Sequence, residues 1–484
     1  MKLVKSLLLG SAAGIAAVAG AQAADLPSRK AAPVEYVRVC SAYGAGFFYI
    51  PGTDTCLRVG GRVRAEYVVG ERYGNGNDAY GTRARGRLNV DARTATAFGT
   101  LRTFFRYELT NSSNFYNGAI GGNQGFIVPG VARVSQTSTA SNLDLAFIQF
   151  GPITAGRAQS FFDFYANDFG FSTLRTADSR LNLLAYTATF GSGFSATLSL
   201  EDRTTGTGNR DSFAVTTRTI LGARARTNAN NTVDVAALDF GRTVPIGGQD
   251  FPDIVASIRA DQGWGSAQLS GAFRQNRVNA LTLTLPGGDP AVVAGTRGGD
   301  DYGWAIQGGV KINLPMLAAG DVLWLQAAYA DGALGYIGYG GTAGVGRLAQ
   351  ISAADVGFDP LTGSMKNSTG WSIVAGLRHF WTPTLRSELY GSYSQLSLAH
   401  TARAGFYADQ TVAPRSLDPK ELIVAGNLIW SPVSGLDLGV EVIYSKVEYK
   451  TRVQGLNDLG VRVAGAGLKS DDAWAGRFRI QRDF

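Results

Sequence analysis

The residues of this chain best suited to chemistry are arginines that recur at every second position. The clearest row lies in 83–95, where the polar side chains are Arg83, Arg85, Arg87, Asn89, Asp91 and Arg93. The residues between them are Ala84, Gly86, Leu88, Val90 and Ala92. Because guanidinium groups bind carboxylates and phosphates, such a row is suited to contact with anionic or polar solutes.

Short catalytic motifs are missing from the sequence. Neither a Gly-x-x-x-x-Gly-Lys-Ser/Thr phosphate loop nor a Gly-x-Ser-x-Gly elbow occurs. The stretch 465–470 resembles the phosphate loop superficially but lacks the spacing of its first glycine. His379 and His400 have no partner nearby in the sequence. We therefore assign no catalytic residue, no cofactor and no metal ligand.

The alternation itself predicts β-strands, because successive side chains of a strand point to opposite faces. Segment 57–69 shows the same pattern, with apolar residues on one face and charged residues on the other. Sixteen segments pass this test: 57–69, 83–95, 100–110, 142–150, 153–160, 181–190, 194–202, 253–261, 266–275, 301–313, 321–330, 370–380, 385–396, 420–430, 436–450 and 474–484. An even number of strands is typical of closed bacterial membrane barrels.

The connections between these segments alternate in length. Short turns are expected at 96–99, 151–152, 191–193, 262–265, 314–320, 381–384 and 431–435. Long loops are expected at 70–82, 111–141, 161–180, 203–252, 276–300, 331–369, 397–419 and 451–473. Short periplasmic turns and long external loops are the asymmetry of a transmembrane barrel, whereas a soluble sandwich or propeller gives no reason for it.

Energetics decide which face of each strand meets water. An arginine facing lipid at mid-membrane costs roughly 2–4 kcal/mol, so the row in 83–95 would together cost on the order of 10 kcal/mol. The arginines must therefore face water, and the apolar face must face lipid. The barrel interior is predicted to be wet.

The N-terminus predicts export. Lys2 and Lys5 precede an apolar stretch, and Ala21-Gln22-Ala23 has the form that signal peptidase accepts. We expect residues 1–23 to be a signal peptide, 24–56 a periplasmic segment and 57–484 the barrel. A transmembrane helix is the weaker alternative, because the stretch is short and a polar segment follows it.

Two cysteines, Cys40 and Cys56, are the only ones in the chain. An oxidising periplasm favours a disulfide between them. Such a bridge closes a loop of about 15 residues, which is worth roughly 3 kcal/mol in the chain-entropy model. A metal site is the alternative, although the two distant histidines offer no ligand spacing.

Composition excludes other classes of protein. The formal charge of +7 falls to +5 without the two lysines of the expected signal peptide. These charges lie singly along strands rather than in runs, so we expect no nucleic-acid partner. No apolar run of about 18 residues follows Ala24, which argues against a helical membrane protein.

The last strand carries a further signal. Trp474, Phe478, Ile480 and the terminal Phe484 fall on one face, with Arg482 as the exception near the strand end. A terminal aromatic on an amphipathic strand resembles the signal that the outer-membrane assembly machinery reads.

Several stretches strongly resemble the alphaproteobacterial general porins. These stretches are 25–27 (DLP), 33–40 (PVEYVRVC), 47–57 (FFYIPGTDTCL), 154–164 (TAGRAQSFFDF) and 477–484 (RFRIQRDF). The resemblance implies an outer-membrane homotrimer of sixteen-stranded barrels, in contact with lipid and lipopolysaccharide, through which small hydrophilic solutes diffuse. It also implies that the third external loop, 161–180, folds into the lumen as a constriction.

In that family the inward loop carries acidic residues that face basic residues of the wall. The loop here offers Asp163, Asp168 and Asp178, with Arg175 and Arg180 as counter-charges. The wall candidates are Arg62, Arg64, Arg85, Arg87 and Arg106. For each aspartate the alternative is a solvated loop residue or a salt bridge between loop and wall. Because wall arginines outnumber loop aspartates, we expect a weak anion preference, which lumen acids such as Glu66, Asp91 and Glu108 oppose.

Three other functions remain open at this point. A channel specific for sugars or organic anions would use the arginine rows as ligand contacts. A structural barrel or adhesin would use its long loops, such as 203–252 and 331–369, to bind a partner. A barrel enzyme with residues assembled across strands is the least favoured.

Overall fold

The computed structural model describes residues 38–71, 78–113, 137–205, 213–216, 226–227, 233–234, 243–245, 248–279, 282–284, 290–292, 297–343, 345, 348, 351–358, 362–399, 417–456 and 462–484. The expected signal peptide and His400 lie outside these residues, as do large parts of the long loops. None of the described helices is long and apolar enough to cross a membrane. The chain divides into two compact units, Met1–Leu57 and Arg58–Phe484.

The first unit is built around a disulfide. Cys40 and Cys56 are bonded, with their Cα atoms 6.0 Å apart, which confirms the predicted pairing over the metal alternative. The short helix η1 (Ser41–Tyr43) follows Cys40, and β1 (Phe48–Tyr49) pairs with the start of β2. Phe47 packs against the two buried cysteines.

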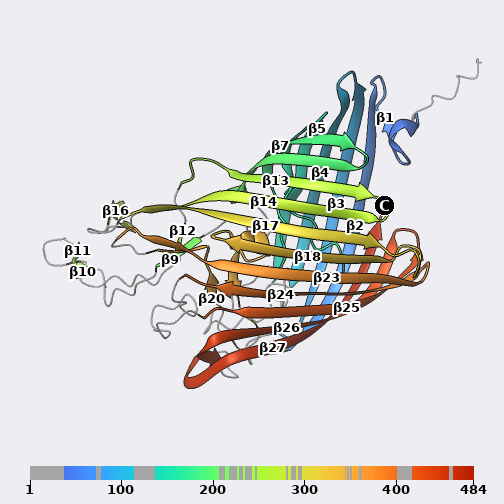
Figure 1. Ribbon diagram of the computed structural model, residues 1–484. Helices are drawn as coiled ribbons and strands as arrows, with labels where there is room; N and C mark the ends of the chain where they lie inside the picture. The colour runs from blue at the N-terminus through green and yellow to red at the C-terminus, as the bar shows by residue number, and fades with distance from the viewer. Residues whose placement is uncertain are drawn as a thin grey trace, which may run out of the picture. The chain divides into compact units, whose positions relative to one another are not determined.

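The second unit is an antiparallel barrel (Figure 1). The main sheet has seventeen strands, and removing the short β1 leaves sixteen among the described residues. They are β2 (Thr55–Gly70), β3 (Tyr80–Thr96), β4 (Gly99–Ser113), β5 (Thr137–Phe150), β6 (Ile153–Gln159), β7 (Arg180–Gly191), β8 (Phe194–Asp202), β13 (Asp253–Gln262), β14 (Gly265–Val278), β17 (Gly299–Asn313), β18 (Val322–Asp331), β23 (Thr369–Thr382), β24 (Leu385–Ser397), β25 (Lys420–Val433), β26 (Leu436–Leu456) and β27 (Arg462–Asp483). All sixteen predicted strands are confirmed.

The barrel closes because its first and last strands pair. β2 and β27 are antiparallel, with Arg62 opposite Asp483 and Gly70 opposite Ala475. Beyond the last strand, the Gly61 amide donates to the Phe484 carbonyl and the Phe484 amide donates to the Gly61 carbonyl. Closure leaves no edge whose backbone groups would lack partners in lipid.

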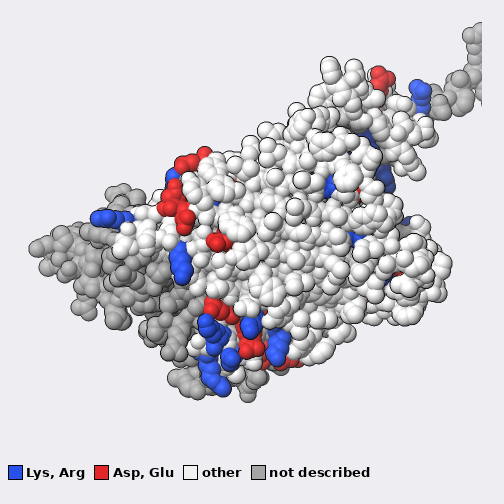
Figure 2. Space-filling model, viewed as in Figure 1, with Lys and Arg blue, Asp and Glu red and all other residues white. Residues whose placement is uncertain are grey.

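The two faces of the strands differ as predicted. Along β2, Val63, Tyr67 and Val69 are exposed, while Glu66 is buried on the opposite face. Figure 2 shows a broad band across the barrel without Lys, Arg, Asp or Glu, and the charged residues gather mostly at its edges. The apolar side chains thus form the outer surface, and the polar side chains fill the interior.

Short elements lie in the long connections. They are η3 (Arg203–Thr205), β9 (Phe213–Thr216), β10 (Arg226–Thr227), β11 (Val233–Asp234), β12 (Thr243–Pro245), β15 (Thr282–Thr284), β16 (Pro290–Val292), η4 (Leu334–Ile337), β19 (Gly341–Ala343), β20 (Ile351–Ala353), β21 (Val356–Phe358) and β22 (Met365–Asn367). The predicted short turns are confirmed; β3 and β4, for example, are separated by two residues.

One predicted loop is wrong. The sequence predicts a long loop at 451–473, but β26 continues to Leu456 and β27 begins at Arg462. The two strands pair beyond the sequence-predicted ends, with Val453 opposite Leu468 and Leu456 opposite Arg462. Register shifts in this region break the regular alternation on which the prediction depended.

Candidate pore-lining site

Strand pairing brings the wall arginines together on one side of the barrel interior. β3 and β4 place Arg93 opposite Arg102, Asn89 opposite Arg106 and Arg87 opposite Glu108. β2 continues the row, because it lies between β3 and β27. We call the inward-facing arginines of β2, β3, β4 and β27 the arginine ladder; its members are Arg62, Arg64, Arg83, Arg85, Arg87, Arg93, Arg102, Arg106, Arg477 and Arg479.

Most carboxylates that bind the ladder contact two or more arginines, whereas Asp483 binds Arg62. Glu66 binds Arg83 at 2.5 Å and Arg479 at 2.6 Å. Asp91 binds Arg93 at 2.8 Å and Arg102 at 2.9 Å. These carboxylates fix the guanidinium groups in place without cancelling their charge.

The same arrangement recurs farther along the ladder. Glu108 binds Arg87 and lies 3.4 Å from Arg85. Asp144 on β5 lies 3.3 Å from Arg106 and 3.2 Å from Arg180. Along this wall the positive groups therefore outnumber the negative groups that hold them.

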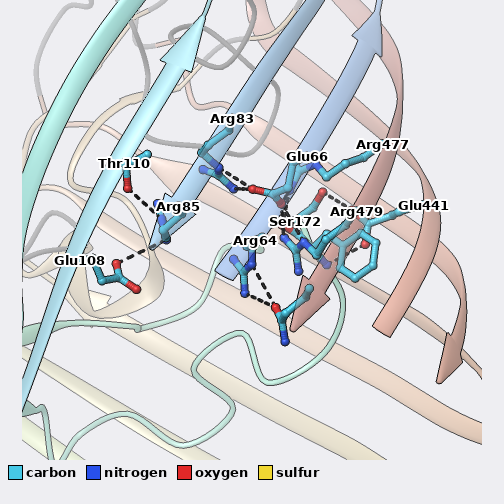
Figure 3. A network of polar contacts seen from close by, with 12 residues as sticks. Arg64, Glu66, Arg83, Arg85, Glu108, Thr110, Ser172, Glu441, Arg477 and Arg479 are labelled. Carbon is cyan, nitrogen blue, oxygen red and sulfur yellow. Dashed lines mark hydrogen bonds and ion pairs between the residues drawn. The ribbon is translucent and has the colours of Figure 1, made fainter. Parts of the chain in front are cut away.

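Arg64 differs from its neighbours in its partner. Its Nε and Nη2 donate to Oε1 of Gln481, at 3.0 and 2.8 Å, and among the described residues it forms no ion pair with a carboxylate. Figure 3 shows Arg64 beside Arg85 and Arg479, close to where Glu66 meets Arg83. A guanidinium held only by a neutral amide is the group of this wall best placed to bind an anion.

The connection between β6 and β7, residues 160–179, contacts the opposite wall. We call it the L3 segment. Its Gly170 amide donates to Glu388 at 2.6 Å, and its Phe171 amide donates to Glu441 at 2.7 Å. Its Tyr165 amide donates to Gln326 at 2.9 Å. Backbone groups that lack partners of their own are thus satisfied by wall side chains.

The three predicted loop aspartates have different environments. Asp163 is buried and accepts hydrogen bonds from Gln159 Nε2 and the Ser179 amide, both at 2.6 Å. Asp178 is half-buried and lies 3.4 Å from Arg180. Only Asp168 is exposed. Asp163 therefore joins the two ends of the L3 segment. Asp178 also accepts hydrogen bonds from Gln159 and Asn167, so Asp168 is the most exposed of the three.

Arg175 anchors the L3 segment rather than serving as a counter-charge to its aspartates. Its Nε donates to Glu421 at 2.8 Å, and its guanidinium lies over the Tyr339 ring at 4.1 Å. Burial lowers the pKa of Arg175, but the nearby Glu421 carboxylate outweighs burial, so the net shift of the pKa is upward. Burial and Glu421 likewise raise the pKa of Tyr339, so its hydroxyl stays neutral.

The structure brings the wall candidates together, but sequence reasoning missed the residues that hold the L3 segment. Glu388, Glu421 and Glu441 lie at inward positions of β24, β25 and β26. Alternation within the predicted strands marks them as inward-facing. No sequence signal shows that their partners lie more than 200 residues away. Among the described residues, no three His, Cys, Asp or Glu side chains are grouped as metal ligands.

Comparison with known proteins agrees with this architecture. A model of the porin subfamily matches residues 25–477. The porin Omp2b of Brucella suis biovar 1 is 32% identical over 353 residues, which cover 68% of this chain and 85% of that protein. A second Brucella suis Omp2b is 28% identical over 492 residues, covering 99% of this chain and 100% of that protein.

Among solved structures, the outer membrane channel DcaP of Acinetobacter baumannii matches with a TM-score of 0.57 at 15% identity, covering 90% of this chain and 99% of that chain. At this identity the likeness shows the fold alone. The family match and the closed, polar-lined barrel together show that the chain belongs to the porin subfamily and forms a diffusion channel, without enzymatic activity, in the bacterial outer membrane.

Proposed function

We propose that small hydrophilic solutes pass between the L3 segment and the ladder arginines of β2, β3 and β4, and that this gap is the constriction of the channel. The observation that carries the proposal is the distribution of contacts. The L3 segment is hydrogen-bonded to β18, β24 and β26, and Arg477 and Arg479 of β27 donate to its Phe171 carbonyl. The arginines of β2, β3 and β4 instead bind carboxylates of neighbouring strands. We take the path of solutes to run beside these arginines.

The proposed charge pattern favours anions weakly. Asp168 and Asp178 would supply the negative side of the constriction, and the ladder arginines would supply its positive side. The transverse electric field between them favours polar over apolar solutes. The carboxylates of the ladder reduce its net charge but remain outnumbered. The channel should thus pass chloride somewhat better than potassium.

Replacing Arg62, Arg85 and Arg87 together with Gln tests this proposal. The reversal potential in a salt gradient across a planar bilayer should shift toward cation selectivity, because three positive charges leave the constriction. A matched control replaces Arg259, Arg277 and Arg386, which lie on β13, β14 and β24. Equal shifts in both triple variants would remove the ladder from the constriction.

A channel specific for organic anions is a second candidate, and the partner of Arg64 favours it. A guanidinium bound only to an amide can exchange that amide for a carboxylate or phosphate of a solute. Saturable block of conductance by one solute would support specificity. Conductance that rises in proportion to salt would support the general pore.

We further propose the processing and assembly implied by the porin resemblance. Signal peptidase would cleave after Ala23, leaving 24–56 as a periplasmic segment; N-terminal sequencing of the mature protein should begin at Ala24. The barrel would assemble as a homotrimer surrounded by lipid and lipopolysaccharide, inserted by machinery that reads the terminal Phe484. Cross-linking in detergent should trap three chains, and deletion of Phe484 should reduce insertion.

A further inference from the structure

A second connection packs inside the barrel unit, beside the L3 segment. It is Gly332–Tyr339, the start of the connection between β18 and β23, and we call it the clamp segment. The four residues of its 3-10 helix η4, Leu334–Ile337, are all buried, and so is Tyr339. A loop at the mouth of a water-filled channel would ordinarily keep its backbone in solvent.

A buried ionic network holds the clamp segment, formed by residues of β13 and β14 and by Asp355 of the same connection. Arg274 on β14 binds Asp253 at 2.8 Å and Asp355 at 3.1 Å, and its side chain is fully buried. The Tyr336 hydroxyl donates to Asp253 at 2.8 Å, and the Leu334 amide donates to Asp355 at 2.5 Å. Buried charges persist only when they are paired in this way.

The clamp segment also contacts the L3 segment closely. The rings of Phe162 and Tyr336 meet edge to face with centroids 4.6 Å apart. Gly338 has φ +84°, and a Cβ there would lie 2.6 Å from the Thr176 amide nitrogen. The backbones of the two segments therefore approach at a distance that only glycine allows.

Tyr339 and Arg175 form the third link. The Tyr339 ring lies under the Arg175 guanidinium, and its hydroxyl donates to Glu421 at 3.0 Å. Arg175 Nη1 donates to the Gly338 carbonyl at 3.0 Å. The L3 segment is thus fixed to β25 partly through a residue of another loop.

The apolar residues of both segments belong to one buried cluster. Phe162 and Ala177 of the L3 segment join Leu334, Tyr336 and Ile337 of the clamp segment, together with wall residues such as Val255. Apolar side chains packed to this extent exclude water from their part of the interior. Such a cluster does not conduct hydrated solutes.

From these contacts we infer that the clamp segment is a second constriction element, which positions the L3 segment and confines solutes to the side of the arginine ladder. This inference rests on the proposed function, because it takes the L3 segment as one border of the path. Gly338 and Tyr339 are the positioning residues. They set the width of the path without contributing charge to it.

Tyr339→Ala tests the inference by removing the ring and hydroxyl that hold Arg175. Single-channel conductance should rise by about twofold and become noisier, and larger sugars should enter proteoliposomes. The reversal potential should change little, because the ladder is intact. Tyr302→Ala, a change on the outer surface of β17, is the control and should behave as wild type.

Two milder variants keep the test decisive if Tyr339→Ala fails to fold. Tyr339→Phe keeps the ring beneath Arg175 and should raise current noise less than the alanine variant. Gly338→Ala should separate the two segments, whereas Gly86→Ala, where a Cβ meets nothing within 4 Å, should have no effect. Folding is checked by the mobility of unheated protein in SDS gels.

The outcomes separate this inference from the proposed function. The inference would be wrong if folded Gly338→Ala or Tyr339→Ala showed the conductance, noise and sugar permeation of wild type. The ladder proposal would not be affected by that result. An unchanged reversal potential in the arginine triple variant would overturn the ladder proposal, whereas increased conductance in Tyr339→Ala would still support the clamp segment.

Discussion

The two sides of the barrel interior use their charged residues differently. On β2, β3 and β4, arginines and carboxylates bind one another across neighbouring strands. On β14, β24, β25 and β26, charged and polar residues hold the L3 segment and the clamp segment. β27 is the boundary, because Arg479 binds both Glu66 and the Phe171 carbonyl. One wall is thus arranged to remain in contact with water, and the other to remain covered.

Glutamates on the two walls therefore have two different roles. A carboxylate such as Glu66 reduces the charge that a solute meets, whereas Glu388 satisfies the Gly170 amide and has no need to meet a solute. Ionic pairs of the open wall tune selectivity, and those of the covered wall determine shape. The comparison predicts that equivalent substitutions on the two walls give different measurements.

The largest effect should follow from Arg274→Ala on the covered wall. Two carboxylates, Asp253 and Asp355, lose a fully buried partner, although Arg203 still lies 3.6 Å from Asp253. Breaking a buried pair costs about 3–5 kcal/mol. The urea midpoint for unfolding from lipid vesicles should fall accordingly.

Arg93→Ala is the matched change on the open wall. Asp91 keeps Arg102 at 2.9 Å, and Arg93 is partly exposed, so the loss should be about 1 kcal/mol or less. Equal losses of stability in the two variants would contradict the division into an open and a covered wall.

A smaller effect should separate Glu388→Ala from Glu66→Ala. Without Glu388, the Gly170 amide and Arg378 lose their acceptor, so the L3 segment loosens and the open-channel current fluctuates more. Without Glu66, Arg83 and Arg479 lose their shared carboxylate, so the reversal potential shifts toward anions. Noise spectra and reversal potentials from the same bilayers measure both effects. If both variants changed the noise and the reversal potential in the same way, the two glutamates would have the same role, and the distinction between the two walls would be wrong.

The open wall could largely be predicted from the sequence, and the covered wall could not. Alternation in 83–95 separates two faces of the strand, and the cost of arginine in lipid shows that Arg85 and Arg87 face inward. Both arguments need only the local sequence pattern. Tyr339 and Gly338 carry no such signal. Their roles arise from contacts with Arg175 and Thr176, far away in the chain, and only the closed barrel brings these residues together.

The aspartates of the L3 segment show the same limit. Asp163 was a constriction candidate by its type and place in the loop, yet it accepts hydrogen bonds from Gln159 and Ser179 at the two ends of that loop. Sequence identifies an acidic loop residue but does not say whether its carboxylate turns inward to the backbone or outward to solvent. Asp168 and Asp178 stay candidates for the constriction.

The smallest shift of the reversal potential should come from Arg64→Gln, which removes the ladder arginine held by a neutral amide. One charge among many changes the reversal potential little. A phosphate bound there loses a charge-assisted hydrogen bond worth about 1.5–3 kcal/mol, so the phosphate concentration that halves the chloride current should rise by about tenfold or more. Arg259→Gln, whose arginine pairs with Asp261 outside the ladder, should leave that concentration unchanged. If phosphate never reduces the wild-type current, no saturable anion site exists at Arg64, and the open wall serves the general pore through its field alone.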